Sequence, residues 1–374
     1  MREITHTALD IQLDSPNVGQ LEKDYLNRCI DSTFISTYGP YVGEFEQQFA
    51  TFVDSPAAVS IQSGTAAIHL ALYKLGIGPG DEVIVPALTF IASVNPVLYL
   101  GATPVIVDVD PHTWNMDPDK VALAITGRTK AILPVHIYGN PCAMDPLCDL
   151  AREKGIPIVE DAAESLGGTY GGRATGTFGL MGCFSFNGNK VMTTGGGGMI
   201  VSHDRDLVAD LGFLANQARD TAKGYFHPVV GFNYRMTNLE ASMGLAQMEQ
   251  LTEFLARKRR FLEIYREALN ELDHVTFQKE YLGAVSSVWL TSVLIEHPDK
   301  DTATIQSELK QHGIPSRRLF MPLGEHPPYQ AFATQPTPGA DHIYRHGLNL
   351  PSSTCNSYEV TATCAERVRQ VLRT

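Results

Sequence analysis

The sequence predicts an α/β protein in which a large domain, built on a mainly parallel sheet covered by helices, precedes a smaller α+β domain. Between residues 57 and 205, short β-branched runs alternate with helical stretches. Strands that alternate with helices favour right-handed crossovers and a parallel sheet with both faces covered. Nearer the C-terminus, strands and helices mix without that alternation. We therefore expect domains over residues 1–250 and 251–374.

The elements of the large domain are expected in strand–helix order. The expected strands are short apolar runs at residues 57–64, 81–86, 103–110, 130–139 and 156–161. The expected helices lie at residues 65–76, 89–101, 117–125 and 145–154. Ligands of such sheets bind beyond the carboxyl ends of the strands, so we expect a site in the segments that follow them.

A long helix with a polar face is expected over residues 238–272, where it links the two domains. The chain beyond it carries a strand pattern at 286–297 and helix patterns at 301–313 and 357–372. This mixture indicates an α+β appendage.

Composition argues against several classes of protein. A net charge of −12 disfavours broad nucleic-acid binding, which needs a basic surface. No apolar run approaches the roughly 20 residues that span a bilayer, and the N-terminal stretch lacks the apolar segment of a signal peptide. The six cysteines include no C-x-x-C pair, which is typical of free thiols in a reducing compartment. We expect a cytoplasmic protein that binds neither nucleic acid nor membrane.

The first chemical signal is "SGTAA", where a strand turns into a helix. Ser63, Gly64 and Thr65 are small, so their backbone N–H groups are accessible. Together with the helix dipole, such groups favour an anion such as phosphate. A plain N-cap by Ser63 or Thr65 explains the same residues equally well.

The second signal, "VEDAAESLG", places Glu160, Asp161 and Glu164 at the end of an apolar strand. Carboxylates so close together repel one another unless a cation lies nearby. Either the segment is a solvated acidic loop, or Asp161 faces a protonated ring nitrogen.

The third signal is Lys190 in "FSFNGNKVMTTGGGGMI", preceded by Ser185 and Asn187. A lysine whose ammonium is destabilised by its surroundings becomes nucleophilic and forms a Schiff base with an aldehyde. The glycines at 195–198 allow a ligand to approach the backbone closely, although a flexible hairpin has the same composition.

Pyridoxal phosphate carries the three groups that these signals would bind: a phosphate, a pyridinium nitrogen and an aldehyde. Lys190 and Asp161 are therefore the catalytic candidates. No metal is expected, because the chain has no H-E-x-x-H motif and no Cys/His cluster. His69 and His136 are interpreted as structural histidines.

With these motifs, and with "GFNYRMTNLEASMGLAQM" and "LNLPSS", the chain resembles the DegT/DnrJ/EryC1/StrS family of sugar aminotransferases from about residue 16 to the C-terminus. The resemblance implies a fold-type-I enzyme with pyridoxal 5′-phosphate attached to Lys190, and with Asp161 on the ring nitrogen. The other implied cofactor contacts are Gly64, Thr65 and Ser185 at the phosphate, Asn187 close by, Glu164 near the ring hydroxyl, Phe90 stacked on the ring, and Asn233 from the partner subunit. Phe90 is alternatively a core residue. The resemblance thus implies a homodimer with a shared active site.

The segments "NQARDTAKGYFHPVVGFNYRMTN" and "SRRLFMPLGEHPPY" are most similar to family members that aminate C4 of a nucleotide-linked 4-keto sugar. The resemblance implies transfer from L-glutamate to a UDP-2-acetamido-4-keto-2,6-dideoxyhexose of the bacillosamine pathway. A GDP-perosamine synthase-like enzyme and a C3 or aminocyclitol aminotransferase are the alternatives. Residues implied near the sugar or diphosphate are Arg219, Tyr225, His227, the pair Arg317 and Arg318, and His326, although a solvated surface explains them too. Many relatives have histidine where this chain has Gly324.

Three rival interpretations fit the sequence less well. A dinucleotide-binding oxidoreductase needs G-x-G-x-x-G between its first strand and helix, where this chain has "SGTAA". A sugar dehydratase related to this family would carry histidine in place of Lys190. A non-catalytic protein of the same fold would have no use for Lys190 and Asp161.

Overall fold

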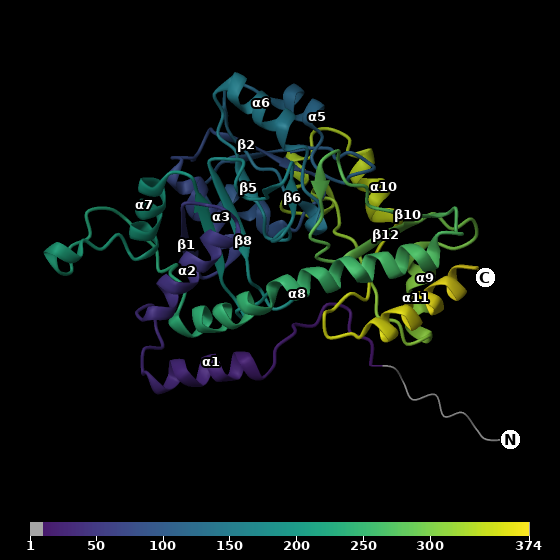
Figure 1. The fold of residues 1–374 in the computed structure, drawn as a ribbon. Helices are drawn as coiled ribbons and strands as arrows, with labels where there is room; N and C mark the ends of the chain where they lie inside the picture. Colours follow the sequence, from purple (N-terminus) through teal and green to yellow (C-terminus); the bar gives the residue numbers. More distant parts are fainter. Residues whose placement is uncertain (1–9, 374) are drawn as a thin grey trace.

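The computed structural model describes residues 10–373. Residues 1–9 and residue 374 lie outside this range. The expectation about a signal peptide falls partly on residues 1–9, and the predicted domain over 1–250 includes them. Strands and helices alternate along the first half of the chain, and one long helix then leads into a second group of elements (Figure 1).

Two hydrogen-bonded sheets form the centre of the first group. The strand order is β1 (Ala57–Ile61), β9 (Gly198–Ser202), β8 (Met181–Ser185) and β5 (Val159–Asp161) in one, and β3 (Thr103–Val107), β2 (Glu82–Pro86) and β4 (Thr129–Ile132) in the other. Parallel bridges between Ile132 and Ile158 and between Val135 and Asp161 join β4 to β5. Only β9 runs antiparallel to its neighbours in these two sheets. The predicted mainly parallel sheet is confirmed.

Helices follow the strands in the predicted order. They are α3 (Gly64–Lys74) after β1, α4 (Asn95–Tyr99) after β2, α5 (Pro118–Ala124) after β3 and α6 (Met144–Lys154) after β4. A further helix, α7 (Arg205–Ala215) after β9, was not predicted. The helix predicted over 89–101 is shorter: a 3-10 turn at Ile91–Ser93 precedes α4. Pro96 sits in the first turn of α4 and has no N–H to continue a helix from the preceding residues.

The strand predicted over 130–139 is also shorter, because β4 ends at Ile132. Its second half forms a 3-10 turn at Ile137–Gly139, in which Tyr138 takes a left-handed conformation with φ 54°. The amide of Tyr138 donates to the Glu164 side chain over 2.8 Å instead of to a neighbouring strand. The backbone of this segment therefore bonds to the loop that borders the site.

The long helix α8 (Asn238–Leu269) passes through the predicted domain boundary at residue 250 without a break. It begins with a capping box between Thr237 and Glu240. Its first part packs against α1 (Gln20–Asp31) and α2 (Pro40–Phe52), and its later part against α11 (Tyr358–Arg373) (Figure 1). One helix thus contributes to both halves, and the division into domains stays a prediction.

The C-terminal half is built on an antiparallel sheet. Its strand order is β10 (Val275–Phe277), β12 (Thr291–Ile295), β14 (Gly347–Leu350) and β13 (Arg317–Arg318). The accompanying helices are α9 (Thr302–Gln311), α10 (Pro338–His346) and α11. A separate buried apolar cluster, which includes Tyr265, Val293 and Val368, joins this sheet to α8 and α11. A small sheet of β11 (Ala284–Val285), β6 (Thr169–Tyr170) and β7 (Arg173–Ala174) was not predicted.

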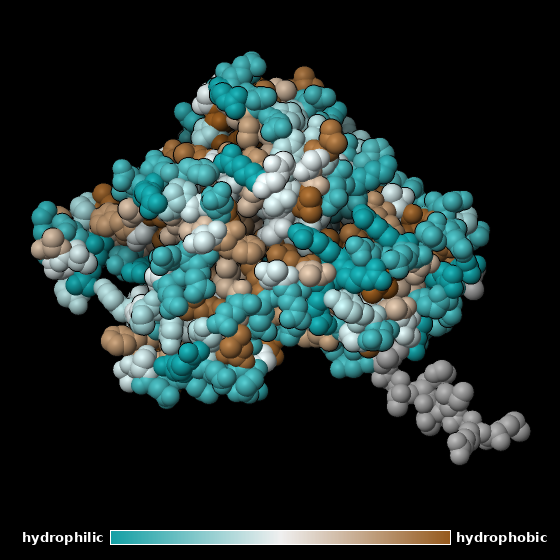
Figure 2. All heavy atoms as spheres, in the orientation of Figure 1, coloured by the Kyte–Doolittle hydropathy of each residue, from teal (hydrophilic) through white to brown (hydrophobic). Residues whose placement is uncertain are grey.

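Hydrophilic side chains cover most of the face shown in Figure 2, and hydrophobic ones are scattered among them. Across residues 10–373, no helix combines the length and the apolar character that crossing a membrane requires.

Candidate active site

A cavity of about 480 Å³ opens beyond the carboxyl ends of β1, β5 and β8. These strands run parallel to one another, so the segments that follow them meet at one edge of the sheet. The predicted site residues that line the cavity are Gly64, Thr65, Phe90, Asp161, Glu164, Ser185, Asn187, Lys190 and Arg317. The fold therefore brings the three chemical signals of the sequence into one place.

The N-terminus of α3 offers free backbone donors to the cavity. Ser63 caps the helix, because its Oγ accepts a hydrogen bond from the amide of Ala66 over 3.1 Å. The amides of Gly64 and Thr65 belong to the first turn, where a helix supplies no backbone acceptor. A β-carbon on Gly64 would lie 2.8 Å from Cβ of Ser185. The N-cap by Ser63 is therefore confirmed, and the binding of an anion by the next two amides stays a prediction.

Asp161 ends β5, lines the cavity and is buried. Its Oδ2 accepts a hydrogen bond from Ser93 Oγ over 2.6 Å, and its Oδ1 accepts one from the amide of Ala163 over 3.0 Å. Ser93 Oγ lies 2.7 Å from Thr89 Oγ1. These bonds hold the carboxylate in one orientation. The sequence reasoning missed Ser93, although it lies one helical turn after Phe90 in the same segment.

Lys190 lies in the turn after β8, where its amide donates to the Asn187 carbonyl over 3.0 Å. Its Nζ is 3.5 Å from Oε1 of Glu164 and 3.9 Å from the centroid of the Trp289 ring. The Lys190 side chain is only 12% exposed. The ammonium group therefore sits between a carboxylate and an aromatic face, and both of these attract a cation.

Burial raises the pKa of the Glu164 carboxyl above its usual range, and nearby Asp161 acts in the same direction. Lys190 and the amide of Tyr138 favour the ionised form and oppose the rise. The net effect is that the pKa of the Glu164 carboxyl, which lies beside Lys190, is above that of an exposed glutamate.

Aromatic rings form one wall of the cavity. Phe90 is 51% exposed and faces this space, so it is not a core residue. Its ring centroid lies 5.6 Å from that of Phe320. Behind them, Tyr138 stacks on Phe320 at 5.2 Å and on Trp289 at 6.2 Å. Trp289 and Phe320 gave no signal in the sequence, because a buried aromatic residue in a strand pattern and a half-buried one in a loop are both ordinary.

Arg317 lines the cavity from β13. Its Nη2 donates to Oδ2 of Asp14 over 2.7 Å, and the same oxygen accepts a hydrogen bond from Asn189 Nδ2 over 3.0 Å. The neighbouring Arg318 bonds elsewhere, because its Nη2 donates to the carbonyl of Tyr344 over 2.6 Å. Of the two predicted arginines, Arg317 thus lines the cavity, whereas Arg318 bonds to the backbone of α10.

The other predicted residues do not line this cavity in the described part of the chain: Arg219, Tyr225, His227, Asn233 and His326. Arg219 lies 3.9 Å from the ring centroid of Tyr225, and His227 Nδ1 lies 2.8 Å from the Gln217 carbonyl. This segment, between α7 and α8, projects away from the body of the molecule (Figure 1). His326 packs edge-on against Tyr329. The roles suggested for these residues stay predictions.

Glu160, the third acid of the strand end, belongs to a different cluster. Its Oε2 accepts a hydrogen bond from the amide of Gly176 over 2.8 Å, and its Oε1 accepts one from Gly179 over 2.6 Å. His136 Nε2 lies 3.0 Å from Oε2. Successive residues of a strand point to opposite faces, so Glu160 is held by backbone donors while Asp161 faces the cavity.

The two histidines interpreted as structural have partners within the fold. His136 is fully buried, and its Nδ1 accepts a hydrogen bond from the amide of Cys142 over 3.0 Å. His69 Nδ1 lies 3.1 Å from the hydroxyl of Tyr234. Neither histidine lines the cavity, so the structural interpretation of both is confirmed.

The cavity suits pyridoxal phosphate by the chemistry of its walls. The missing side chain of Gly64 leaves the first-turn amides of α3 open to a phosphate, and Asp161 offers a fixed carboxylate to a ring nitrogen. Lys190 offers an amine, and Phe90 offers a ring face. These groups complement the phosphate, pyridinium, aldehyde and ring of the cofactor.

Comparisons with known proteins agree with this geometry. Residues 16–369 match the DegT/DnrJ/EryC1/StrS aminotransferase family. The chain is 44% identical over 344 residues to the GDP-perosamine synthase of Caulobacter vibrioides, covering 91% of this chain and 93% of that protein. It is 41% identical over 364 residues to the GDP-perosamine synthase of Escherichia coli O157:H7, covering 96% and 98%. The structure of a protein named "putative sugar aminotransferase Spr1654", from Streptococcus pneumoniae and in its PMP form, aligns with a TM-score of 0.91 at 28% identity, covering 97% of this chain and 98% of that one.

The fold and the cavity define an enzyme of fold type I that depends on pyridoxal phosphate. The chain belongs to the DegT/DnrJ/EryC1/StrS aminotransferase family. The predicted family, fold class, cofactor and class of reaction are thereby confirmed.

Proposed function

We propose that this aminotransferase moves an amino group from L-glutamate to C4 of a nucleotide-linked 4-keto-6-deoxy sugar. The observation that carries the proposal is the meeting of Lys190, Asp161 and the free amides of α3 in one cavity. The names of the relatives support a nucleotide-linked amino sugar as the product.

Each part of the cavity has a separate task in this proposal. Lys190 would hold the cofactor covalently, and the first-turn amides of α3 together with Ser185 would bind its phosphate. Asp161, fixed by Ser93, would keep the ring nitrogen protonated. When bound, the cofactor supplies an electron-accepting ring that stabilises a carbanion. Phe90 would cover the ring face and exclude water.

Lys190 would also carry the proton. Once the amino donor has freed its amine, Nζ would remove the proton from the substrate carbon and later return one, as a general base and then a general acid. The contacts with Glu164 and Trp289 keep this amine at the cavity instead of letting it swing into solvent. A proton carrier acts efficiently only when it is held within reach of the reacting atom.

For the sugar substrate, the relatives favour a GDP-linked 4-keto-6-deoxyhexose, because two proteins named GDP-perosamine synthase each align with more than nine tenths of this chain. The UDP-2-acetamido-4-keto-2,6-dideoxyhexose favoured by the sequence motifs is the second candidate. Arg317 would contact the diphosphate in either case, since a guanidinium binds phosphate oxygens through two parallel hydrogen bonds.

A panel of substrates separates these candidates. The enzyme, loaded with cofactor and supplied with glutamate, is incubated with GDP-, UDP- and dTDP-linked 4-keto-6-deoxy sugars, and the amino sugars are identified by mass spectrometry and NMR. We expect amination at C4 with the GDP-linked ketone preferred. Amination at C3, or of a cyclitol ketone only, would replace the proposal with the corresponding alternative. Lys190→Ala serves as the inactive control.

We also propose a homodimer with shared active sites, because several of the predicted site residues do not line the cavity of their own chain. Asn233 and the projecting segment with Arg219, Tyr225 and His227 would reach the cavity of the partner subunit. Co-refolding Lys190→Ala with Asn233→Ala tests this directly, because a mixed dimer would contain one intact site. We expect the mixture to show activity well above that of the inactive Lys190→Ala and of the weakened Asn233→Ala. Mixtures that stay as inactive as their parents would contradict the shared site.

A further inference from the structure

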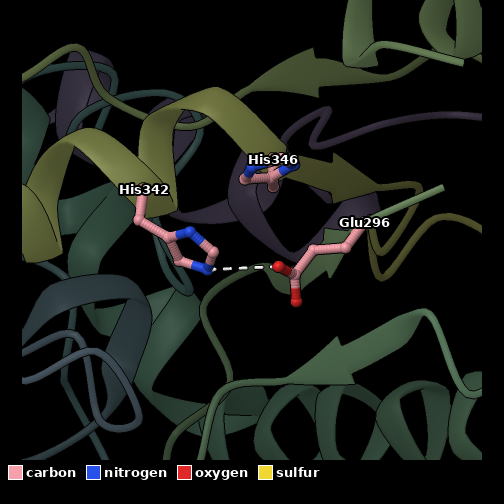
Figure 3. Close-up of side chains that lie close together, drawn as sticks. All are labelled: Glu296, His342 and His346. Carbon is pink, nitrogen blue, oxygen red and sulfur yellow. Dashed lines mark ion pairs between the residues drawn. The ribbon is translucent and has the colours of Figure 1, made fainter. Parts of the chain in front are cut away.

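Two histidines and a glutamate form a cluster of potential metal ligands away from the active site. One ligand atom from each of Glu296, His342 and His346 lies within 4.8 Å of the other two. His342 Nε2 and Glu296 Oε1 are 3.7 Å apart. The two imidazole centroids are 4.9 Å apart. Figure 3 shows both rings on the same side of α10, with the Glu296 carboxylate directed toward them.

Local structure explains why these side chains meet. His342 and His346 are four residues apart on α10, and this spacing places two side chains on one helix face. The pairing of Leu294 in β12 with Gly347 in β14 brings the end of β12 beside the last turn of α10. Glu296 directly follows β12. The sequence alone predicts no metal site here, because the third ligand comes from a distant segment.

We propose that Glu296, His342 and His346 bind one divalent transition-metal ion of the zinc type. Tetrahedral bonds of about 2.0–2.1 Å place ligand atoms about 3.3 Å apart. Rotation of the side chains brings the ligand atoms to this distance from one another. The side chains of His342 and Glu296 are free to rotate, since they are 40% and 50% exposed. Two imidazoles and one carboxylate suit Zn²⁺, Co²⁺, Ni²⁺ or Cu²⁺, whereas Mg²⁺ and Ca²⁺ prefer oxygen ligands alone.

Such an ion would tie α10 to the end of β12. The carbonyls of Tyr344 and Arg345, in the same turn as the two histidines, accept hydrogen bonds from Arg318. Arg318 neighbours Arg317, which lines the active-site cavity. Binding at the cluster would therefore stiffen the C-terminal sheet close to the predicted diphosphate contact. This role is independent of which sugar the enzyme aminates.

Titration of the untagged holoenzyme with Co²⁺ tests the proposal. The protein is first freed of metal with a chelator, and Co²⁺ is then followed by its visible d–d absorption and by elemental analysis after dialysis. We expect one ion per chain, displaced by Zn²⁺ but not by Mg²⁺. His342→Ala and His346→Ala should each weaken binding at least tenfold. His312→Ala, which changes an exposed histidine at the end of α9, should leave binding unchanged.

Further outcomes and controls make the result interpretable. The cofactor itself binds metals, so binding that survives unchanged in the His342→Ala/His346→Ala double variant would overturn the proposal. Failure of the wild-type holoenzyme to take up Co²⁺ at micromolar concentrations would overturn it as well. Circular dichroism and cofactor absorbance confirm that the variants are folded. Zn²⁺ should raise the thermal midpoint of the wild type and of His312→Ala, and should leave that of the double variant unchanged.

Discussion

The Nζ atom of Lys190 lies 3.9 Å from the centroid of the Trp289 ring, and Trp289 is itself fixed at both ends. Its indole Nε1 donates to the carbonyl of Asn189 over 2.6 Å, next to Lys190 in the chain. Its backbone carbonyl accepts a hydrogen bond from the buried Lys258 over 2.8 Å. A tryptophan from the C-terminal half thus holds the amine of a lysine that follows β8.

Replacing Trp289 should slow catalysis more than it weakens cofactor binding. Trp289→Leu removes both the ring face and the indole N–H, and a partly desolvated cation–π contact contributes about 0.5–2 kcal/mol. We expect kcat to fall roughly 2- to 30-fold on this basis. Trp289→Phe keeps a ring face and should lose less. Steady-state kinetics with a saturating cofactor concentration measure both variants, and equal kcat values in all three proteins would contradict the contact's role.

Lys258 should make stability depend on pH. Burial lowers the pKa of this lysine to about 8, from an ordinary value of 10.5. Between these values the unfolded chain holds a proton that the folded chain has released, so the contribution of Lys258 to stability rises with pH across this window, by up to about 3 kcal/mol. Below pH 8 the contribution is constant.

Lys258→Met should abolish that pH-dependent contribution. The change also leaves the carbonyls of Trp289 and Ser352, which now accept hydrogen bonds from Nζ, without a partner. We expect a loss of about 1–3 kcal/mol for each group left unsatisfied. Denaturant unfolding from pH 7 to 10.5 measures both effects, with the exposed Lys310→Met as control. A gap between wild type and Lys258→Met that stays constant above pH 8 would refute the assignment.

Asp161→Asn should remove a charge while keeping the shape of the side chain. The amide that replaces the carboxylate can still accept the hydrogen bond from Ser93, but it cannot form an ion pair with a protonated ring nitrogen. Loss of one fixed electrostatic partner lowers kcat on the order of 10²–10³-fold. Ser93→Ala leaves the charge in place and should have a smaller effect. Kinetics and the absorbance of the bound cofactor test the pair, and the opposite ranking would be incompatible with the role given to Asp161.

Gly64→Ala should weaken cofactor binding. The new β-carbon would lie 2.8 Å from Cβ of Ser185, so α3 must move away from β8 and the first-turn amides move with it. We expect at least about a tenfold higher Kd for pyridoxal phosphate, which corresponds to about 1.4 kcal/mol. Gly43→Ala, in α2 with no atom within 4 Å of the new carbon, is the matched control and should stabilise the fold slightly. Equal Kd values would show that the close approach is unimportant.

The sequence predicted the parts of the fold and site that depend on local pattern. Strand–helix alternation indicated the parallel sheet, and the residues that follow β1, β5 and β8 met at one edge as expected. The predicted ends of elements were wrong where the backbone forms hydrogen bonds outside a regular ladder or helix. The strand predicted up to residue 139 ends at Ile132, because Pro134 has no N–H to continue the ladder, and farther along Glu164 accepts from the amide of Tyr138.

Tertiary contacts were beyond the reach of the sequence pattern. Nothing in the pattern around Trp289 or Phe320 distinguishes a cavity wall from an ordinary core, since both are apolar residues near strands. Ser93 was missed because a serine in a turn is common. Similarity to relatives suggested Asn233 and the segment with Arg219, but within residues 10–373 neither of them lines the cavity.

Borohydride reduction of the holoenzyme, followed by peptide mapping, tests most directly the claim that Lys190 holds the cofactor. Reduction converts a lysine–cofactor linkage into a stable secondary amine that mass spectrometry locates. We expect the added mass on the peptide that contains Lys190, and no such mass in Lys190→Ala. An active, cofactor-loaded enzyme that carries the label on another lysine, or that resists reduction altogether, would contradict this role of Lys190.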